Sequence, residues 1–443
     1  MGGKLRQDRR QRRRATAKWL TEGREARLTI ESLGGQGDGV GRLQGRPLYV
    51  AGALPGEEVR VRLGDKSGRG ALLEVLTQAA ERREAPCPHF GPCGGCRLQH
   101  LEVEAYRTWK RGLLVTALRN RGFAEAEAQV GALVGVPPGR RRRVTWTAQR
   151  RAGRIALGFL QEGSHHLVDQ TRCLLLLPTL EALLEPLRQL LGQLLDEGQR
   201  ARVTATDSET GIDLLLGLTG SLDLAARETL ASFAEAQDLA RLGLSLDEEA
   251  PEPLASRRQP WISFQGLRVS LPFAPFLQPS REGEDRLQRA VLAALPDDGA
   301  PLADLYAGLG TFSLPLAARG HSVLAVESEA AALTALQAAA RATGLEGRLA
   351  VSQRNLGRRP LSAAELKPLS ALVFDPPKAG AAEQSALLAE AGPPLLVAVS
   401  CNPTSFARDA QTLAAGGYRL EGVMPLDQFP WSHHLELVAT FRR

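Results

Sequence analysis

The pattern of apolar and polar positions changes along this chain and divides it into differently built parts. Between residues 28 and about 77, apolar and polar positions alternate in short runs such as Leu28–Ile30, Leu48–Val50 and Val59–Leu63. Glycine-rich turns separate these runs, which is typical of short β-strands. About five strands of this kind predict a small β-barrel of the oligonucleotide-binding type.

The C-terminal part has a different rhythm, in which short apolar runs alternate with helical segments rich in Ala and Leu. This alternation predicts a doubly wound α/β domain from about residue 276 onward. We expect its strands at Leu302–Leu305, Ser322–Val326, Ala371–Phe374, Leu395–Val399 and Leu437–Phe441. Between about 130 and 275, strand-like and helix-like runs are mixed, so periodicity predicts an α/β composition there but no topology.

These patterns predict a multidomain chain. We expect a basic, disordered tail over residues 1–24, the barrel over 25–79, a central domain over 80–275 and the doubly wound domain over 276–443. Apolar and aromatic positions among basic ones predict a helix at about 100–122, and we expect it to pack on the last domain.

The composition is that of an ordinary globular protein, because 43% of the 443 residues are hydrophobic and 23% are charged. No window of about 18 uninterrupted apolar residues predicts a membrane span. The N-terminus lacks the apolar core of a secretory signal. We therefore expect a cytoplasmic protein that has no membrane partner, and no obligate protein partner is evident.

The charge is concentrated rather than spread. The net charge is +6, and residues 1–27 alone carry ten Lys or Arg against three acids. A second basic stretch, Arg140–Arg154, contains no acid. Arg outnumbers Lys throughout the chain, so a compositional bias could produce such clusters, but their electrostatics favour contact with a nucleic acid.

A glycine-containing turn marks the most specific α/β signal. Asp304–Ser313 follows an apolar strand and precedes a helix, which is the place where such folds bind nucleotide-like cofactors. Ser313 stands where a dinucleotide fingerprint would have its third glycine. Glu327 ends the next strand and can accept hydrogen bonds from ribose hydroxyls. Asp375–Pro377 closes a later strand, which is a common place for an Asp-Pro-Pro motif in methyltransferases. This motif favours S-adenosylmethionine over a dinucleotide.

A cysteine follows the next predicted strand. A lone Cys is most often a small buried hydrophobe, but Cys401 lies in a turn at the carboxyl end of Leu395–Val399. Beside a methyl donor, a thiolate can add to carbon 6 of uracil and make carbon 5 nucleophilic enough to accept a methyl group. A base must then remove the carbon-5 proton. Chemistry alone ranks Glu436 and His434 about equally for that role, with His433 also nearby.

The other four cysteines indicate a metal site. Cys87, Cys93 and Cys96 are spaced Cys-x5-Cys-x2-Cys, and Cys173 is distant. In a reducing compartment such spacing argues for metal rather than for disulfides. Four thiols suit either zinc or a [4Fe–4S] cluster, and the two glycines between Cys93 and Cys96 favour the bulkier cluster only slightly.

Several motifs together resemble the bacterial RNA uridine-5-methyltransferase family. They are Asp304–Leu316, Asp375–Gly380, Val399–Pro403 with Ala407–Asp409, and Phe429–Glu436. The resemblance implies that Cys401 is the nucleophile, that Glu436 is the base, and that Asp375 helps position the uracil. It also implies a set of cofactor-site residues: Gln278, Tyr306, Gly308, Gly310, Thr311, Glu327, Asn355 and Asp375. Ser280 stands where the family has Asn; Gln428 replaces a usual Met and Lys378 a usual Arg, and we expect these last two changes to leave the chemistry untouched.

The N-terminal half resembles the subgroup of this family that carries a TRAM domain and a [4Fe–4S] cluster. Gly37–Gly39 and Leu54–Glu57 look like TRAM, and Cys-x5-Cys-Gly-Gly-Cys looks like the cluster motif. The resemblance implies that Cys87, Cys93, Cys96 and Cys173 hold the cluster, which we expect to be structural or to position RNA. It implies a Rossmann-like methyltransferase domain and an RNA-binding central domain.

The expected substrate is a uridine in RNA, with 23S rRNA favoured over tRNA because TRAM and cluster together are commoner among the ribosomal enzymes. The target base would have to leave its stack to reach Cys401. The alternatives are a tRNA uridine-5-methyltransferase, an RNA cytidine methyltransferase and a non-catalytic iron–sulfur RNA-binding protein. An RNA cytidine methyltransferase would have a second cysteine at this edge of the sheet, where this chain has Glu436, so Glu436 argues against a cytidine substrate.

Overall fold

The computed structural model describes residues 23–64, 68–161 and 164–443, so residues 1–22 of the predicted basic tail lie outside the described part. The chain forms two compact units. The first contains the described residues up to Trp109 together with Trp431–His433, and the second contains the described residues of Lys110–Pro430 and of His434–Arg443. Among the described residues, no helix is both long and apolar enough to cross a bilayer.

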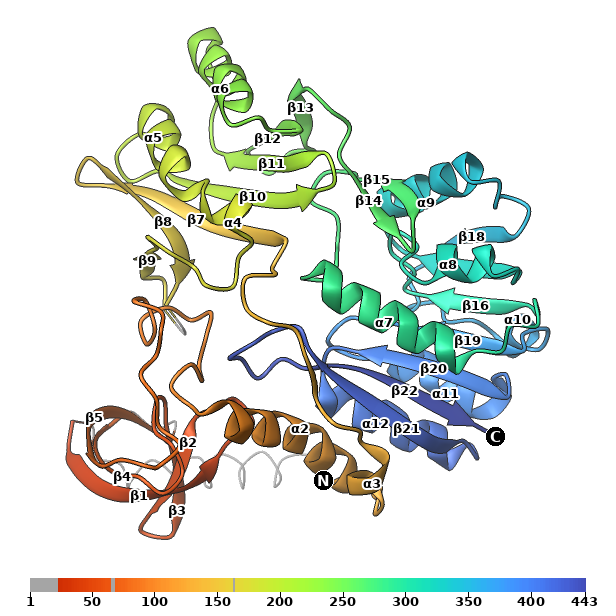
Figure 1. Cartoon of the computed structure of the whole chain (residues 1–443), viewed down its shortest axis with the longest axis horizontal. Helices are drawn as coiled ribbons and strands as arrows, with labels where there is room; N and C mark the ends of the chain where they lie inside the picture. The colour runs from red at the N-terminus through yellow and green to blue at the C-terminus, as the bar shows by residue number, and fades with distance from the viewer. Residues whose placement is uncertain (1–22, 65–67, 162–163) are drawn as a thin grey trace, which may run out of the picture. The chain divides into compact units, whose positions relative to one another are not determined.

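The first unit contains the predicted barrel, which is closed in the strand order β1-β2-β3-β5-β4 (Figure 1). Its strands are β1 (Glu25–Leu33), β2 (Gly39–Leu43), β3 (Arg46–Val50), β4 (Glu58–Leu63) and β5 (Arg69–Thr77). The alternating apolar positions fill its interior, for example Leu48 and Val50, which are fully buried. Gly39 is required because a Cβ there would lie 2.6 Å from the carbonyl oxygen of Ala53.

Two acidic residues of the predicted TRAM motifs are buried in ion pairs within this unit. Asp38 is 2% exposed and lies 3.0 Å from Arg97 and 3.3 Å from Arg69. Glu57 is fully buried and accepts hydrogen bonds from Arg82 and from the Leu54 amide. A buried carboxylate is tolerated only when it is paired in this way, so both motifs have a structural role.

The central part of the second unit contains a seven-stranded sheet in the order β13-β12-β11-β10-β7-β8-β9. Its strands are β7 (Arg143–Arg151), β8 (Arg154–Leu160), β9 (Leu167–Asp169), β10 (Arg200–Ser208), β11 (Gly211–Leu218), β12 (Arg241–Leu246) and β13 (Glu252–Ser256). One face is apolar and packs against helices, as Val144, Trp146 and Ala148 of β7 show. The helices are α4 (Pro178–Glu181), α5 (Leu184–Leu194) and α6 (Leu224–Ala236). A hairpin of β14 (Trp261–Phe264) and β15 (Leu267–Ser270) follows.

The predicted doubly wound domain is an eight-stranded sheet in the order β18-β17-β16-β19-β20-β22-β21-β6. The strands are β6 (Val134–Gly135), β16 (Leu302–Leu305), β17 (Val323–Glu327), β18 (Leu349–Gln353), β19 (Ala371–Phe374), β20 (Leu395–Ser400), β21 (Arg419–Asp427) and β22 (Glu436–Arg442). The first five in the sheet are parallel, and β22 runs antiparallel to β20. Every residue of β16, β19 and β20 is buried, because helices cover both faces of the sheet.

Two apolar cores lie on the two faces of this sheet. One includes residues of α7 (Arg281–Ala294), α8 (Ser313–Ala318) and α9 (Ala330–Ala342). The other includes residues of α10 (Ala363–Leu366), α11 (Ala382–Ala391) and α12 (Pro403–Ala415), together with Leu114 and Leu118. Those two leucines belong to α2 (Val103–Arg119), the helix expected at about 100–122, and α3 (Ala126–Gln129) follows it. The C-terminal half of α2 therefore packs on the α/β sheet.

Candidate active site

The loop after β16 has the backbone of a cofactor-binding turn. Tyr306, Gly308 and Gly310 all have positive φ angles, at 62°, 55° and 92°. A Cβ at Gly310 would lie 2.3 Å from Leu336 Cδ1, so only glycine fits there, whereas a Cβ at Gly308 would meet nothing within 4 Å. Open space beside Gly308 leaves the backbone accessible to a ligand, as such turns require.

Carboxylates gather around this turn. Glu327, at the end of β17, accepts a hydrogen bond from the Gly308 amide at 3.0 Å. Asp304 is fully buried; its Oδ2 accepts from Ser313 at 2.5 Å, while its Oδ1 has no partner. Burial raises the pKa of Asp304 to about 7, and nearby Asp375 and Glu327 add to that rise. A group of acidic side chains around such a turn suits a cationic ligand, such as a sulfonium.

The other expected cofactor residues lie on the same edge of the sheet. Thr311 follows the two glycines, and its carbonyl accepts a hydrogen bond from Gln288 Nε2 of α7 at 3.0 Å. Gln288 is a contact that the sequence did not reveal. Asn355 lies exposed after β18, and its carbonyl accepts from the Arg358 and Arg359 amides. Burial raises the pKa of Tyr306 to about 12, so its hydroxyl stays protonated.

Asp375 and Gln278 are joined directly. Asp375 follows β19, and Gln278 precedes α7 and is only 4% exposed. Gln278 Nε2 donates to Asp375 Oδ2 at 3.3 Å. Burial raises the pKa of Asp375 to about 7. Two residues from distant parts of the sequence are thus brought together beside the turn.

Cys401 and Glu436 come together through strand register. The ladder between β20 and β22 ends with the pair Ser400 and Leu437, and Cys401 and Glu436 are the residues directly next to that pair. Burial raises the pKa of Cys401 to about 11, and the negative charges of Glu436 and Asp375 contribute. Burial and Asp375 also raise the pKa of Glu436, to about 8.

A buried lysine that no pattern in the sequence indicated lies near Glu436. Lys110 of α2 is fully buried, and its Nζ lies 2.5 Å from Asp427 Oδ1 and 2.8 Å from the Phe429 carbonyl oxygen. The positive charge of Lys110 opposes the rise in the pKa of Glu436. His434, the alternative base, packs its ring against Phe429 with 5.6 Å between ring centroids.

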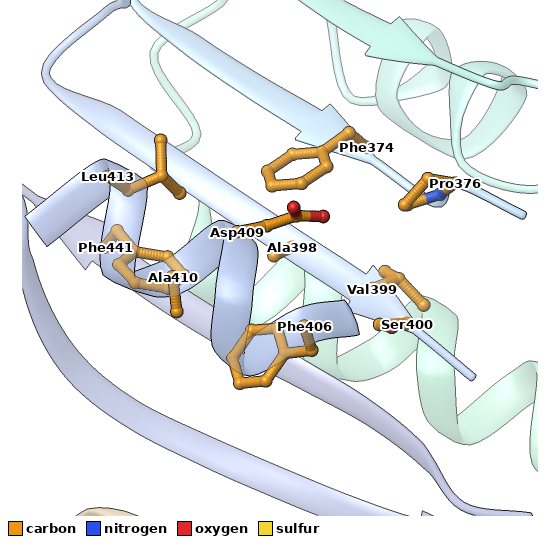
Figure 2. A pocket seen from close by; sticks show the side chains of 10 residues that line it. All are labelled: Phe374, Pro376, Ala398, Val399, Ser400, Phe406, Asp409, Ala410, Leu413 and Phe441. Atoms are coloured by element: carbon orange, nitrogen blue, oxygen red, sulfur yellow. The ribbon is translucent and has the colours of Figure 1, made fainter. Parts of the chain in front are cut away.

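Hydrogen bonds of Asn402 hold the loop that carries Cys401. Asn402 caps α12 by accepting from the Thr404 amide, and its Nδ2 donates to the Lys378 carbonyl oxygen. A cavity of about 10 Å³ lies between β20 and α12 (Figure 2), and apolar side chains and the carboxylate of Asp409 line it. It has room for no more than about one water molecule. It belongs to the packing that holds the loop and is not a substrate pocket.

The cysteine loop belongs to the first unit. Cys87, Cys93 and Cys96 are half-buried there, and Cys173 is buried in the second unit. All five cysteines lie in the described part of the chain, and none is in a disulfide. Within that part, no three His, Cys, Asp or Glu residues are arranged as a metal site. The Arg97 and Leu98 amides, directly after Cys96, both donate to the Trp431 carbonyl oxygen, at 2.8 and 3.2 Å.

One exposed aromatic lies beside Gln278. Phe276 is 72% exposed, which is unusual for a side chain of this size. An exposed aromatic two residues from a buried active-site amide is suited to stacking on a base. Its position in Phe276-Leu277-Gln278 was visible in the sequence, but its exposure was not.

Comparisons with known proteins show which sequences this chain is similar to. A family profile described as tRNA (Uracil-5-)-methyltransferase matches residues 270–443, and a TRAM domain profile matches residues 20–67. An uncharacterized RNA methyltransferase of Rhizobium meliloti is 39% identical over 422 residues, which cover 94% of this chain and 99% of that protein. The 23S rRNA (uracil(1939)-C(5))-methyltransferase RlmD of Pectobacterium atrosepticum is 33% identical and covers 97% of this chain, with 96% of its own length matched.

A solved structure shows the same fold. The tRNA (uracil-54, C5)-methyltransferase of Pyrococcus abyssi, determined with S-adenosyl-L-homocysteine, superimposes with a TM-score of 0.71. The superposition covers 94% of this chain and all of that one, at 23% sequence identity. The predicted combination of a TRAM barrel with a Rossmann-like α/β domain is confirmed.

Proposed function

The chain belongs to the TRAM-containing RNA (uracil-5-)-methyltransferase family and is an S-adenosylmethionine-dependent enzyme of that class, and we propose that it methylates carbon 5 of a uridine in 23S rRNA through covalent catalysis by Cys401. The observation that supports the mechanism is that Cys401 and Glu436 lie at the neighbouring ends of β20 and β22, where the charges of Glu436 and Asp375 act on the Cys401 thiol. We propose that the reaction takes place in the cytoplasm.

The cofactor site would be formed by the turn after β16 and its surrounding carboxylates. S-adenosylmethionine bound there supplies an electrophilic methyl group to carbon 5. The unpartnered Oδ1 of Asp304 and the carboxylate of Glu327 suit the positive charge and the ribose hydroxyls of this molecule. Gly308, Gly310, Tyr306 and Thr311 would border it from the turn, and Asn355 from the end of β18.

Cys401 would begin the reaction by adding to carbon 6 of the uracil. Its thiol has a pKa of about 11 and must lose a proton, for which Asp375, with a pKa of about 7, is the acceptor we propose. Addition makes carbon 5 enolate-like, so that it takes up the methyl group. Glu436 then removes the hydrogen from carbon 5. The carbon-5–carbon-6 double bond re-forms, the sulfur leaves carbon 6, and Cys401 recovers its proton from Asp375.

Glu436 fits the role of base better than His434 does. Glu436 is 4% exposed, its Oε2 has no partner, and its charge acts on the Cys401 thiol. His434 instead contacts the ring of Phe429. These contacts support Glu436, rather than His434, as the base that we propose.

The exposed ring of Phe276 supports an RNA substrate, since it could stack on a base that has left its helix. We favour 23S rRNA because the RlmD relatives match almost the whole chain. A tRNA substrate is the second candidate, since the matching family profile carries a tRNA description.

We also propose that the cysteine loop holds a [4Fe–4S] cluster. Three thiols lie on one short loop, with Gly94 and Gly95 between Cys93 and Cys96. These donors fit an iron–sulfur cluster; Cys173 remains the fourth ligand that the sequence resemblance implies. Anaerobically purified protein should be brown and contain iron, Cys93→Ser should lose the iron, and Cys401→Ser should keep it. A colourless, zinc-loaded protein would reject the cluster.

The substrate can be tested in a deletion strain. Its ribosomal and transfer RNA would be mapped by mass spectrometry for missing 5-methyluridine, with the wild-type gene and Cys401→Ala as the two complementing alleles. We expect one or more 23S rRNA marks to disappear and to return only with the wild-type gene. Loss confined to tRNA would favour the second candidate, and retention of every mark in both pools would rule out the proposal.

A further inference from the structure

Gln428 directly follows β21, and its side chain is hydrogen-bonded to the loop that carries Gln278. Gln428 Nε2 donates to Gln278 Oε1 at 2.8 Å, and Gln428 Oε1 accepts from Ser280 Oγ at 3.4 Å. Gln278 Nε2 in turn donates to Asp375 Oδ2 at 3.3 Å. Gln278, Ser280 and Gln428 are each at most 4% exposed. These hydrogen bonds connect Ser280 to Asp375 through two side-chain amides.

The backbone of this loop is held independently of Gln428. Arg142 Nε donates to the Gln278 carbonyl oxygen at 3.1 Å, and the Arg142 amide donates to the Pro279 carbonyl oxygen at 2.9 Å. Arg142 also forms a buried ion pair with Glu284 of α7, at 2.6 Å. Since the backbone of Gln278 is fixed by these contacts, what remains to be set is the orientation of its carboxamide.

The direction of each hydrogen bond sets that orientation. The oxygen and nitrogen of a carboxamide are similar in size, so only their partners distinguish its two orientations. The Gly283 amide donates to Ser280 Oγ at 3.1 Å, and the Ser280 hydroxyl donates to Gln428 Oε1. Gln428 must then turn its N–H groups to Gln278 Oε1. Gln278 is left with its own N–H groups facing Asp375.

We propose that Gln428 is a positioning residue that fixes the Gln278 carboxamide with its N–H groups toward Asp375 and the reacting pyrimidine. This inference rests on the proposed function. Addition of Cys401 places negative charge on the uracil ring, and a donor oriented beforehand stabilises that charge without reorganising. A reversed carboxamide would instead present an oxygen to the Asp375 carboxylate and to the developing charge.

Two substitutions of similar size separate positioning from packing. Gln428→Met removes the amide and leaves the long hydrogen bond to Asp375 as the only one of these contacts that orients the Gln278 carboxamide. Gln428→Glu accepts from Ser280 but cannot donate to Gln278 Oε1, so it favours the reversed carboxamide. We expect single-turnover methylation to slow about tenfold in Gln428→Met and about a hundredfold in Gln428→Glu, with KM for RNA changed less than about twofold.

A third variant displaces Gln428 without removing its amide. A Cβ at Gly283 would lie 2.0 Å from Gln428 Oε1, so Gly283→Ala should slow methylation as Gln428→Met does. Gly112→Ala is the matched control, because Gly112 also lies in a helix and a Cβ there meets nothing within 4 Å. Gln384→Met controls for loss of a buried amide, since Gln384 is fully buried and bonded to the backbone of Leu361. Both controls should keep the wild-type rate.

A double-mutant cycle provides the decisive readout. If Gln428 acts through Gln278, its substitutions should have no further effect on kcat in a Gln278→Ala background. The positioning role is overturned if Gln428→Glu is as fast as Gln428→Met, or if the full loss persists in that background. Wild-type enzyme that methylates no uridine in any RNA would overturn the proposed function itself. An active wild type with unaffected Gln428 variants would overturn only the positioning role.

Discussion

Lys110→Met removes the buried positive charge behind the proposed base while keeping a side chain of similar length. Lys110 is fully buried and pairs with Asp427 at 2.5 Å, and its charge opposes the rise in the pKa of Glu436. Burial lowers the pKa of Lys110 to about 8, so its charge acts on Glu436 mainly below that pH. Without that charge, the pKa of Glu436 should rise above its value of about 8. Because Glu436 acts in its ionised form, the acidic limb of the pH–rate profile should move to higher pH.

The size of the shift follows from the surroundings of Lys110. An opposite charge within about 4–6 Å shifts a carboxyl pKa by roughly 1–3 units. Asp427 already balances much of the charge of Lys110, and Asp375 also acts on Glu436, so we expect a shift of about one pH unit, which corresponds to about 1.4 kcal/mol. Losing one partner of a buried ion pair should also cost about 3–5 kcal/mol of folding stability.

The assay is single-turnover transfer of a labelled methyl group to RNA between pH 6 and pH 10. Lys110→Met is compared with wild type, with Lys110→Met/Asp427→Leu, and with Lys367→Met, whose lysine is exposed. The double variant should recover part of the stability, because it leaves no unpaired charge, but should keep the displaced acidic limb. If the limb of folded Lys110→Met coincides with that of wild type, the electrostatic role of Lys110 is refuted.

Three other predictions follow from the cofactor site and its supports. Binding of S-adenosylmethionine near pH 7 should release protons, because its positive charge lowers the pKa values of Asp304 and Asp375 from about 7. Calorimetry in buffers of different ionisation enthalpy should show that S-adenosylhomocysteine releases fewer protons. Equal proton release by the two ligands would contradict the cation argument. Gly310→Ala should weaken cofactor binding more than about tenfold, because its Cβ would clash with Leu336 and its φ is 92°. In the same titration Gly347→Ala should bind the cofactor normally, because a Cβ at Gly347 meets nothing within 4 Å. Arg142→Met should lose about 3–5 kcal/mol in urea unfolding because Glu284 is left buried and unpaired, and a loss no larger than that of Arg142→Met/Glu284→Leu would show that pairing is not the cause.

Much of the fold follows from periodicity in the sequence. Leu302–Leu305 and Ala371–Phe374 were expected as strands and form β16 and β19 with those bounds. Such strands are recognisable because the centre of a parallel sheet buries both of their faces. The stretch from Leu180 to Leu195 has a helix-like pattern, and in the structure it is divided between α4 and α5. The topology of the central sheet was not predictable, because the pairing of β7 with β10 joins residues more than 50 positions apart.

The site was predictable where a motif carries the chemistry and hidden where distant residues support it. Cys401, Asp375 and Glu436 each follow or begin a recognisable strand, so a common edge could be expected for them. Lys110 forms a hydrogen bond with Asp427, which lies 317 positions away in the sequence, and no sequence pattern around either residue indicates the other. Gln428 was expected to leave the chemistry untouched, yet its amide contacts Gln278. Its direction of hydrogen bonding is a property of the folded loop rather than of any local sequence.

Covalent trapping at Cys401 tests the central claim most directly. Fluorine at carbon 5 cannot be removed as a proton by Glu436, so after methyl transfer the bond between Cys401 and carbon 6 should persist. Enzyme incubated with S-adenosylmethionine and 23S rRNA fragments containing 5-fluorouridine should form a complex stable in SDS, and peptide mapping should place the RNA on Cys401. Cys401→Ser should form none. An adduct on another cysteine, or 5-methyluridine formed by Cys401→Ala, would contradict the account.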